Sequence, residues 1–209
     1  GGGAFKNNEG IYSWNKSLIE GKEHYDPSVR LLDQSRIGAI LTGEKKDLGG
    51  GPPVKALLIQ NTNPMVVAPD LNKVHAGFAR EDLFTCVHEQ LLTDTAKMAD
   101  IVLPATAFLE HSDIYQAGGH QHVQLGKKII EPPGKARDNH FVICEIAKRV
   151  GAKHPGFEMT ADEIIAATLN ASGMPDSNKL AGMRWFDCQP SFEEAHYLNG
   201  FAHDDGKFH

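Results

Sequence analysis

The chain has 209 residues, with 21 lysines and arginines against 27 aspartates and glutamates, so its formal net charge is −6. This acidic balance argues against an electrostatic nucleic-acid binder. Hydrophobic residues make up 41% and charged residues 23%, which excludes a wholly disordered chain. No apolar run approaches the ~20 residues that a membrane-spanning helix needs.

The three cysteines, Cys86, Cys144 and Cys188, are far apart in the sequence. Their odd number and spacing fit neither a disulfide framework nor a cysteine-based metal site, so we expect a reducing, cytoplasmic location. The sequence starts at Gly1 without a methionine and shows no targeting signal. We therefore expect a piece of a longer protein.

The part before residue 54 contains one predicted helix. The first ~25 residues lack periodicity and are expected to be irregular. Apolar residues then recur near helical spacing over 27–41, and Gly43 would end this helix. Glycines and prolines at 45–53 predict a loop. We expect three parts in the whole chain: an irregular and helical segment at 1–53, a Rossmann-like domain at 54–151 and a helical extension at 152–209.

Three predicted strands alternate with helices in the central part. Short apolar runs at 54–60 and 83–88 predict strands buried on both faces, and 100–104 predicts a third such strand. Between them, the apolar spacing over 69–80 predicts a helix, and 93–99 predicts a shorter one. Strands that alternate with helices imply a parallel sheet, so the expected fold class is α/β, with a mainly parallel sheet and flanking helices.

The character changes after the third strand. Residues 111–122 are polar and contain glycines, and 123–130 predicts another strand. Asp138 is placed to cap a helix at 139–150, which Gly151 would end. The spacing of Thr160 and Glu163 is that of a capping box, which begins a helix through about residue 171. We expect short helices and loops in the remainder, as a small C-terminal helical extension.

Polar residues follow the first two predicted strands. Asn61 and Asn63 lie in an Asn-Pro loop after one strand, while Glu89 and Thr93 follow the next. Open α/β sheets bind ligands at the carboxyl ends of their strands, where such groups can meet a phosphate or a sugar. The alternatives are a plain turn at the first loop and, at the second, a simple helix cap at Thr93 or Asp94 with Glu89 as a solvated surface acid. No G-x-G-x-x-G fingerprint, P-loop or G-x-S-x-G motif is present.

A second group of candidate side chains consists of three histidines and an aspartate: His111, Asp113, His120 and His122. Zinc takes about three such ligands in catalytic sites. No H-E-x-x-H framework accompanies them, and Gly118-Gly119 predicts a flexible loop. We therefore assign no metal site to this chain, and a loop or substrate-channel role is favoured.

The order and spacing of several motifs resemble the molybdopterin oxidoreductases of the dimethyl sulfoxide reductase type. The resemblance rests on four stretches: residues 56–64, ending in Asn-Thr-Asn-Pro; residues 83–89, ending in Glu89; Thr93-Asp94-Thr95-Ala96; and residues 99–105 with Glu110. The family has a Thr-Glu-Thr-Ala-like stretch, so Asp94 replaces the commoner glutamate. Residues 132–138 also resemble the family's P-x-G-x-A-x-x-D approach to a helix.

This resemblance implies a Rossmann-like domain that binds one of two molybdopterin guanine dinucleotides, which together chelate molybdenum. Carried over by position, Asn61 and Asn63 would line the nucleotide-binding turn. Glu89 and Thr93 would face the guanosine, and Asp138 is a further cofactor-binding candidate. A 4Fe-4S cluster, the molybdenum ligand and the electron partner would belong to the rest of the parent enzyme, so we expect no activity from this chain alone.

Two other functions remain open at this point. A stand-alone nucleotide-binding module would use the same strand ends without redox chemistry. A metalloenzyme would instead use the His111, His120 and His122 loop. Titration with a guanine nucleotide and elemental analysis for zinc would distinguish them.

Overall fold

The computed structural model describes residues 14–15, 26–116, 120–201 and 203–209, which form two compact units. The parallel unit contains the described residues of 26–110 and 130–150, and the antiparallel unit contains those of 14–15, 111–129 and 151–209. These units differ from the three parts expected from the sequence in two respects: residues 26–53 belong to the parallel unit, and the described residues of 111–129 belong to the antiparallel unit. Most of the predicted irregular N-terminal segment lies outside the described residues.

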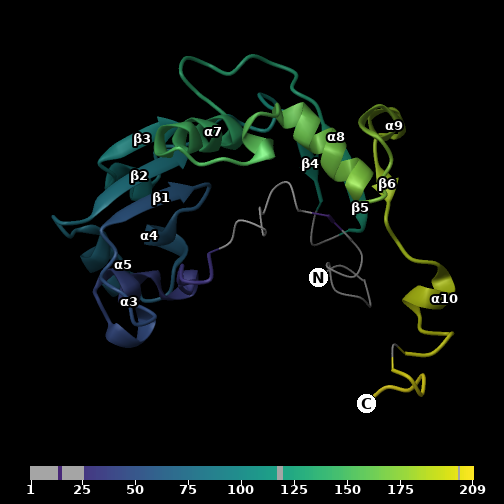
Figure 1. Ribbon diagram of the computed structural model, residues 1–209, viewed down its shortest axis with the longest axis horizontal. Coiled ribbons are helices and arrows are strands. Elements are labelled where there is room, and N and C mark those ends of the chain that lie inside the picture. The colour runs from purple at the N-terminus through teal and green to yellow at the C-terminus, as the bar shows by residue number, and fades with distance from the viewer. Residues whose placement is uncertain (1–13, 16–25, 117–119, 202) are drawn as a thin grey trace. The chain divides into compact units, whose positions relative to one another are not determined.

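The parallel unit is built on a three-stranded sheet (Figure 1). Its strands are β1 (Ala56–Gln60), β2 (Phe84–Glu89) and β3 (Ile101–Pro104), in the order β1-β2-β3. Both pairs are parallel, with Gln60 opposite His88 and Glu89 opposite Pro104. The predicted α/β fold with a parallel sheet is confirmed.

Helices precede, connect and follow the strands of the parallel unit. They are α3 (Ile37–Leu41) before β1, α4 (Pro64–Val67) and α5 (Leu71–Phe78) between β1 and β2, α6 (Asp94–Lys97) between β2 and β3, and α7 (Asn139–Val150) at the end of the unit. The chain enters α5 through Asp70 and α6 through Thr93, whose side chains accept hydrogen bonds from backbone amides of the first turn. Local capping signals in the sequence therefore explain where these helices begin.

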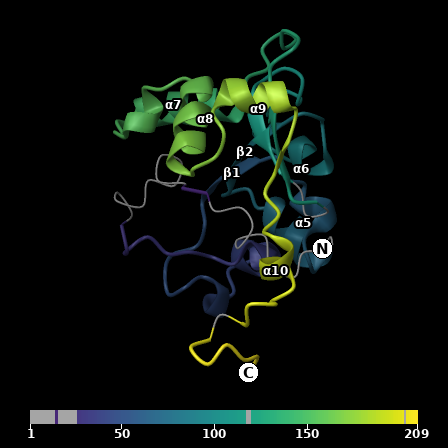
Figure 2. The same cartoon turned by 90° about the vertical axis from the view of Figure 1, so that its right-hand side faces the viewer.

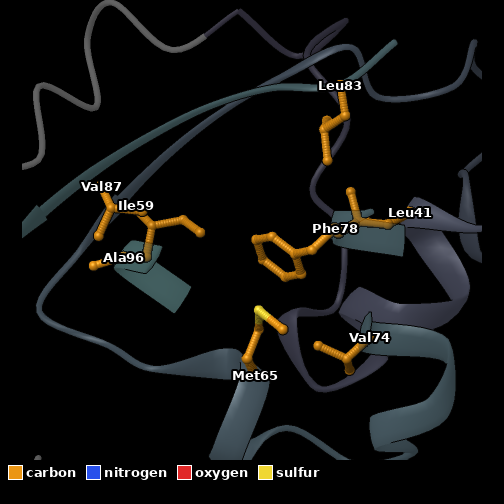
Figure 3. Close-up of a cluster of buried hydrophobic side chains, with 8 residues drawn as sticks. All are labelled: Leu41, Ile59, Met65, Val74, Phe78, Leu83, Val87 and Ala96. Carbon is orange, nitrogen blue, oxygen red and sulfur yellow. The ribbon is translucent and has the colours of Figure 1, made fainter. Parts of the chain in front are cut away.

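Eight buried apolar side chains form the core of the parallel unit (Figure 3). They are Leu41, Ile59, Met65, Val74, Phe78, Leu83, Val87 and Ala96. The Phe78 ring lies in the middle of this cluster in Figure 3, among side chains from α3, α4 and the strands. The helices α3 to α6 thus contribute one apolar layer against one face of the sheet.

The strands are not buried on both faces, so that prediction was wrong. Ile59 and Val87 point into the core, whereas Leu58 is 45% exposed and Phe84 is 47% exposed. Successive side chains of a strand point to opposite faces, so the core covers one face here, whereas the other face is covered only in part: His88 is buried on it, but Leu58 and Phe84 are exposed. A run of apolar residues cannot by itself show how many faces are covered.

The helix predicted over 27–41 is also shorter than expected. It begins with a 3₁₀ turn at Gln34–Arg36, and Asp33 accepts a hydrogen bond from the Ser35 amide at 2.9 Å. Val29 and Leu32, the first two apolar residues of the predicted pattern, lie before any helix, and Val29 is exposed, so their spacing does not reflect a buried helical face. The Asp33 cap, rather than the apolar spacing, sets the start of this element.

The antiparallel unit has its own sheet and core. Its strands, β4 (Asp113–Tyr115), β5 (His122–Gly126) and β6 (Phe186–Asp187), pair in that order. Of these, β4 lies in the stretch predicted to be a loop, and β5 ends four residues before the predicted strand does. At Gly126, which pairs with Asp113, a Cβ atom would come within 2.3 Å of the Tyr115 ring, so only glycine fits beside this ring without displacing it.

Helices complete the antiparallel unit as expected for the C-terminal part. They are α8 (Ala161–Ala171), α9 (Ser177–Met183) and α10 (Phe192–Ala195). The predicted capping box of Thr160 and Glu163 is present. Helices α8 and α9 lie beside each other (Figure 2), and Leu169 and Leu180 from them are buried with Val123 of β5. Within the part of the chain described here, no helix has the length and apolar character needed to cross a membrane.

Candidate functional site

The predicted cofactor-binding residues lie along the carboxyl ends of the parallel strands. Asn61 directly follows β1, and its amide donates to the His88 carbonyl of β2 at 3.3 Å. Glu89 ends β2, and its carbonyl accepts from the Ala105 amide beyond β3 at 3.0 Å. We call this region the carboxyl edge, defined by residues 60–63, 88–95, 104–106 and 137–138. Parallel pairing brings these sequence-distant segments to one side of the sheet.

Asn61 has a conformational role in the turn after β1. Its φ angle is 54°, in the left-handed region that asparagine tolerates better than most residues. This conformation directs the chain out of the strand and toward Asn63 and Pro64, where α4 begins. The side chain of Asn61 is exposed at the carboxyl edge.

Asn63 connects this turn to α6 through its side-chain carbonyl. Its Oδ1 accepts from the Thr95 amide at 3.2 Å and from the Thr95 hydroxyl at 2.7 Å. The Thr95 hydroxyl in turn accepts from the Met65 amide at 3.1 Å. Thr95 is fully buried. The carbonyl end of Asn63 is therefore used within the fold, and its amide Nδ2 is the end that can donate to a ligand.

Glu89 and Thr93 flank the short loop that follows β2. Glu89 is half-buried, and its Oε1 accepts from the Gln90 amide at 2.7 Å. The Gln90 side chain donates to the Thr106 carbonyl at 2.9 Å, which ties this loop to the segment after β3. The Thr93 hydroxyl accepts from the Ala96 amide at 3.2 Å, so the alternative interpretation of Thr93 as a helix cap is realised.

Asp138 lies at the same edge because the preceding residue pairs with β3. The Arg137 amide donates to the Pro104 carbonyl at 3.0 Å, and the Arg137 carbonyl accepts from the Thr106 amide at 3.2 Å. The Asp138 carboxylate accepts from the Phe141 amide at 2.7 Å, which confirms its predicted role as the cap of α7. One oxygen of Asp138 is therefore engaged in the helix start.

Sequence reasoning missed His88, which is fully buried at the carboxyl edge. Its Nδ1 lies 3.1 Å from Gln60 Nε2, and its Nε2 lies 2.9 Å from the Arg137 carbonyl oxygen. The available signal was a histidine near the end of an otherwise apolar strand. The partner at Arg137 is 49 residues away in sequence, so no local pattern could have identified it.

Two titratable groups of the parallel unit with shifted pKa values, Asp82 and Cys86, lie away from the carboxyl edge. Arg80 and Lys55 donate hydrogen bonds to Asp82 and hold the pKa of its carboxyl far below the usual range. Asp82 precedes β2, so this ion-pair group lies at the opposite end of that strand. Burial raises the pKa of the Cys86 thiol in the middle of β2. Neither shift concerns a residue of the carboxyl edge.

The histidine group of the antiparallel unit makes no assembled metal site among the residues described. The His120 Nδ1 accepts from the His122 amide at 3.1 Å, and the two rings are 5.3 Å apart. His122 Nε2 is 3.8 Å from an Asp187 carboxylate oxygen. No group of three or more histidine, cysteine, aspartate or glutamate side chains in the described ranges is arranged to hold a metal ion. Gly118 and Gly119, which predicted a flexible loop, lie outside those ranges.

Known proteins match this chain over most of its length. The Bacillus subtilis protein named "Probable oxidoreductase YoaE" is 37% identical over 182 residues, which cover 87% of this chain and 25% of that protein. The trimethylamine-N-oxide reductase of Haemophilus influenzae is 35% identical over 187 residues, covering 80% of this chain and 22% of that protein. The chain thus spans about a quarter of the length of these curated relatives.

A solved structure and a family model agree with these relatives. Acetylene hydratase from Pelobacter acetylenicus superposes with a TM-score of 0.62 and 24% identity, over 82% of this chain and 23% of that one, which supports the fold. The family model described as molybdopterin oxidoreductase matches residues 40–149, more than half of the chain, including every candidate residue of the carboxyl edge. The chain therefore belongs to the molybdopterin oxidoreductase family.

Proposed function

We propose that the carboxyl edge binds the nucleotide end of one molybdopterin guanine dinucleotide in a molybdenum oxidoreductase. Membership of the family implies a molybdenum–pterin cofactor. The observation that carries the finer proposal is the placement of Asn61, Asn63, Glu89 and Thr93 at one edge of a parallel sheet. Sugar hydroxyls, phosphates and a guanine base all need polar partners of this kind.

The donor set at the edge fits such a ligand. Glu89 is half-buried and keeps a carboxylate that can accept from a ribose hydroxyl or from a guanine N–H. Asn63 can donate through Nδ2, because its Oδ1 already accepts from Thr95. Asp138 uses one carboxylate oxygen for the α7 amide, and its second oxygen can accept from a ligand. The edge therefore combines acceptors for the nucleoside with at least one donor.

In this proposal the chain binds and orients, while the molybdenum and its pterins supply the redox chemistry. The remaining ligands of the metal, any 4Fe-4S cluster and the electron partner belong to the rest of the parent enzyme. The chain corresponds to about a quarter of its curated relatives, so we propose that it has no turnover by itself. The cytoplasmic location, which rests on the three separated cysteines, stays part of the proposal.

The test replaces Glu89 by alanine in the full-length enzyme. Loss of a buried acceptor should weaken retention of the dinucleotide by about 1 to 3 kcal/mol. Guanine released after acid hydrolysis and molybdenum by elemental analysis, both per mole of purified protein, measure this retention. Glu81→Ala is the matched control, because Glu81 is an exposed glutamate before the other end of β2. Unchanged guanine and molybdenum content in Glu89→Ala would exclude the carboxyl edge as the nucleotide site.

A further inference from the structure

We infer that His88 is a positioning residue of the carboxyl edge. Through the contacts of its two ring nitrogens, it ties the segment before α7 to the ends of β1 and β2 and thereby holds Asp138 in place. The expected effect of His88 on cofactor binding rests on the proposed function, whereas its effect on the segment before α7 does not. Three features of the parallel unit support the inference: the tautomer of the ring, the route of the connection and the burial of the ring.

The contacts of the ring indicate which of its nitrogens donates and which accepts. A backbone carbonyl can only accept, so the 2.9 Å contact with the Arg137 oxygen places a hydrogen on Nε2 of His88. In the neutral ring Nδ1 is then the acceptor, and the Gln60 amide can donate to it across 3.1 Å. Both ring nitrogens have a suitable partner. The neutral Nε2–H tautomer therefore satisfies this site.

The connection joins three segments that are distant in sequence. Gln60 ends β1, His88 belongs to β2, and Arg137 precedes the cap of α7. Arg137 also pairs with the backbone beyond β3, where its carbonyl accepts from the Thr106 amide at 3.2 Å. The β3 contacts fix the backbone of this segment along the edge, and His88 adds a side-chain bond from the neighbouring strand. The next residue is Asp138, so its carboxylate depends on this arrangement.

Burial makes both bonds necessary. His88 has no exposed surface, and a buried polar ring without partners would be strongly unfavourable. An aliphatic side chain could fill the same space but could not bond to the Arg137 carbonyl. The histidine therefore provides a directional connection where packing alone would only fill volume.

The experiment compares two variants in the full-length enzyme by hydrogen exchange and mass spectrometry. In His88→Gln, the longer side chain can place its amide where Nε2 was and retain the bond to Arg137. In His88→Asn, the shorter side chain can accept from Gln60 but cannot reach Arg137. Both variants are polar and smaller than histidine, and they differ in which bond they keep and by one methylene group in length. His75→Asn is the control, because His75 also contacts a backbone carbonyl, that of Met65, but is exposed on α5.

We expect peptides covering 132–138 to exchange about tenfold faster in His88→Asn, as the loss of one buried bond implies. In His88→Gln these peptides should exchange nearly as fast as in the wild type, and in His75→Asn their exchange rate should be unchanged. Guanine content should fall in His88→Asn and be restored in His88→Gln.

Two results would overturn the inference. One is unchanged exchange at 132–138 in His88→Asn. The other is equally fast exchange in both His88 variants, which would indicate a packing role. Faster local exchange with normal guanine content would refute the consequence for the cofactor. The proposed function is decided separately, by the guanine content of Glu89→Ala.

Discussion

Replacing Asn63 by alanine should destabilise the parallel unit more than its place in a loop indicates. The substitution removes the acceptor of two hydrogen bonds from Thr95, one from its amide and one from its hydroxyl. Thr95 is fully buried, so water cannot replace that acceptor without opening the turn. An unsatisfied buried donor costs about 1 to 3 kcal/mol, and the hydroxyl can reorient. We therefore expect a loss of about 1 to 3 kcal/mol in the free energy of unfolding, chiefly from the unsatisfied Thr95 amide.

Asn63→Asp separates this structural effect from ligand binding. A carboxylate keeps an oxygen for the Thr95 donors and lies near the first turn of α6, where negative charge is favourable. We expect its free energy of unfolding to stay within about 1 kcal/mol of the wild type. Its guanine content should nevertheless fall, because the Nδ2 donor is gone and a negative charge would face a phosphate.

The assay for Asn63 is urea-dependent hydrogen exchange at the amides of β2 in the 209-residue chain. Tryptophan fluorescence is unsuitable, because Trp14 and Trp185 both belong to the antiparallel unit. Equal stability of Asn63→Ala and the wild type would refute the reasoning from the Thr95 bonds. Equal destabilisation by alanine and aspartate would show that the acceptor is not what matters.

Three further predictions follow from the same unit. Asn61→Gly should preserve the free energy of unfolding, whereas Asn61→Val should lower it by about 1 to 2 kcal/mol, because a β-branched residue is strained at a φ angle of 54°. Urea unfolding followed at β2 measures both variants, and equal stabilities of the two would contradict the prediction. Asp82→Asn should lower the free energy of unfolding at pH 7. The difference from the wild type should shrink as the pH falls below about 4, because the Asp82 carboxyl, whose pKa is lowered in the fold, stabilises the fold only while it is ionised. Paired unfolding curves at pH 7 and pH 3, with Glu81→Gln as control, measure it, and a constant difference would count against the ion pairs. The 209-residue chain supplied with the cofactor should show no molybdenum-dependent turnover in a dye-linked assay, and measurable turnover would show that it is catalytically complete.

Local signals account for the elements that the sequence predicted well. Helix α7 occupies the predicted 139–150 because Asp138 caps it through the Phe141 amide. Helix α8 occupies 161–171 because Thr160 and Glu163 form a capping box within four residues. The carboxyl edge was predictable for a different reason, since parallel strands necessarily bring their ends to the same side.

Features that depend on distant partners could not be predicted from local patterns. The unequal coverage of the two sheet faces depends on where α3 to α6 pack, and β4 forms a strand through its pairing with β5. The same holds for His88, whose partners Gln60 and Arg137 lie 28 and 49 residues away. A pattern within one strand shows that a residue is polar or apolar, but not which groups will meet it.

Two polar side chains of the carboxyl edge, Asn63 and Asp138, have one end engaged within the fold and another atom able to bond to a ligand. Asn63 accepts from Thr95 on one side and keeps a donor on the other, which neither aspartate nor alanine can do. Asp138 starts α7 with one oxygen and has a second oxygen available to a ligand. Glu89 differs, because its side chain accepts a hydrogen bond from the adjacent Gln90 amide, so its removal breaks no bond to a distant element. Glu89 is therefore the position where a loss of cofactor can be attributed to the ligand contact itself, whereas at Asn63 the alanine and aspartate variants must be compared before the same conclusion is drawn.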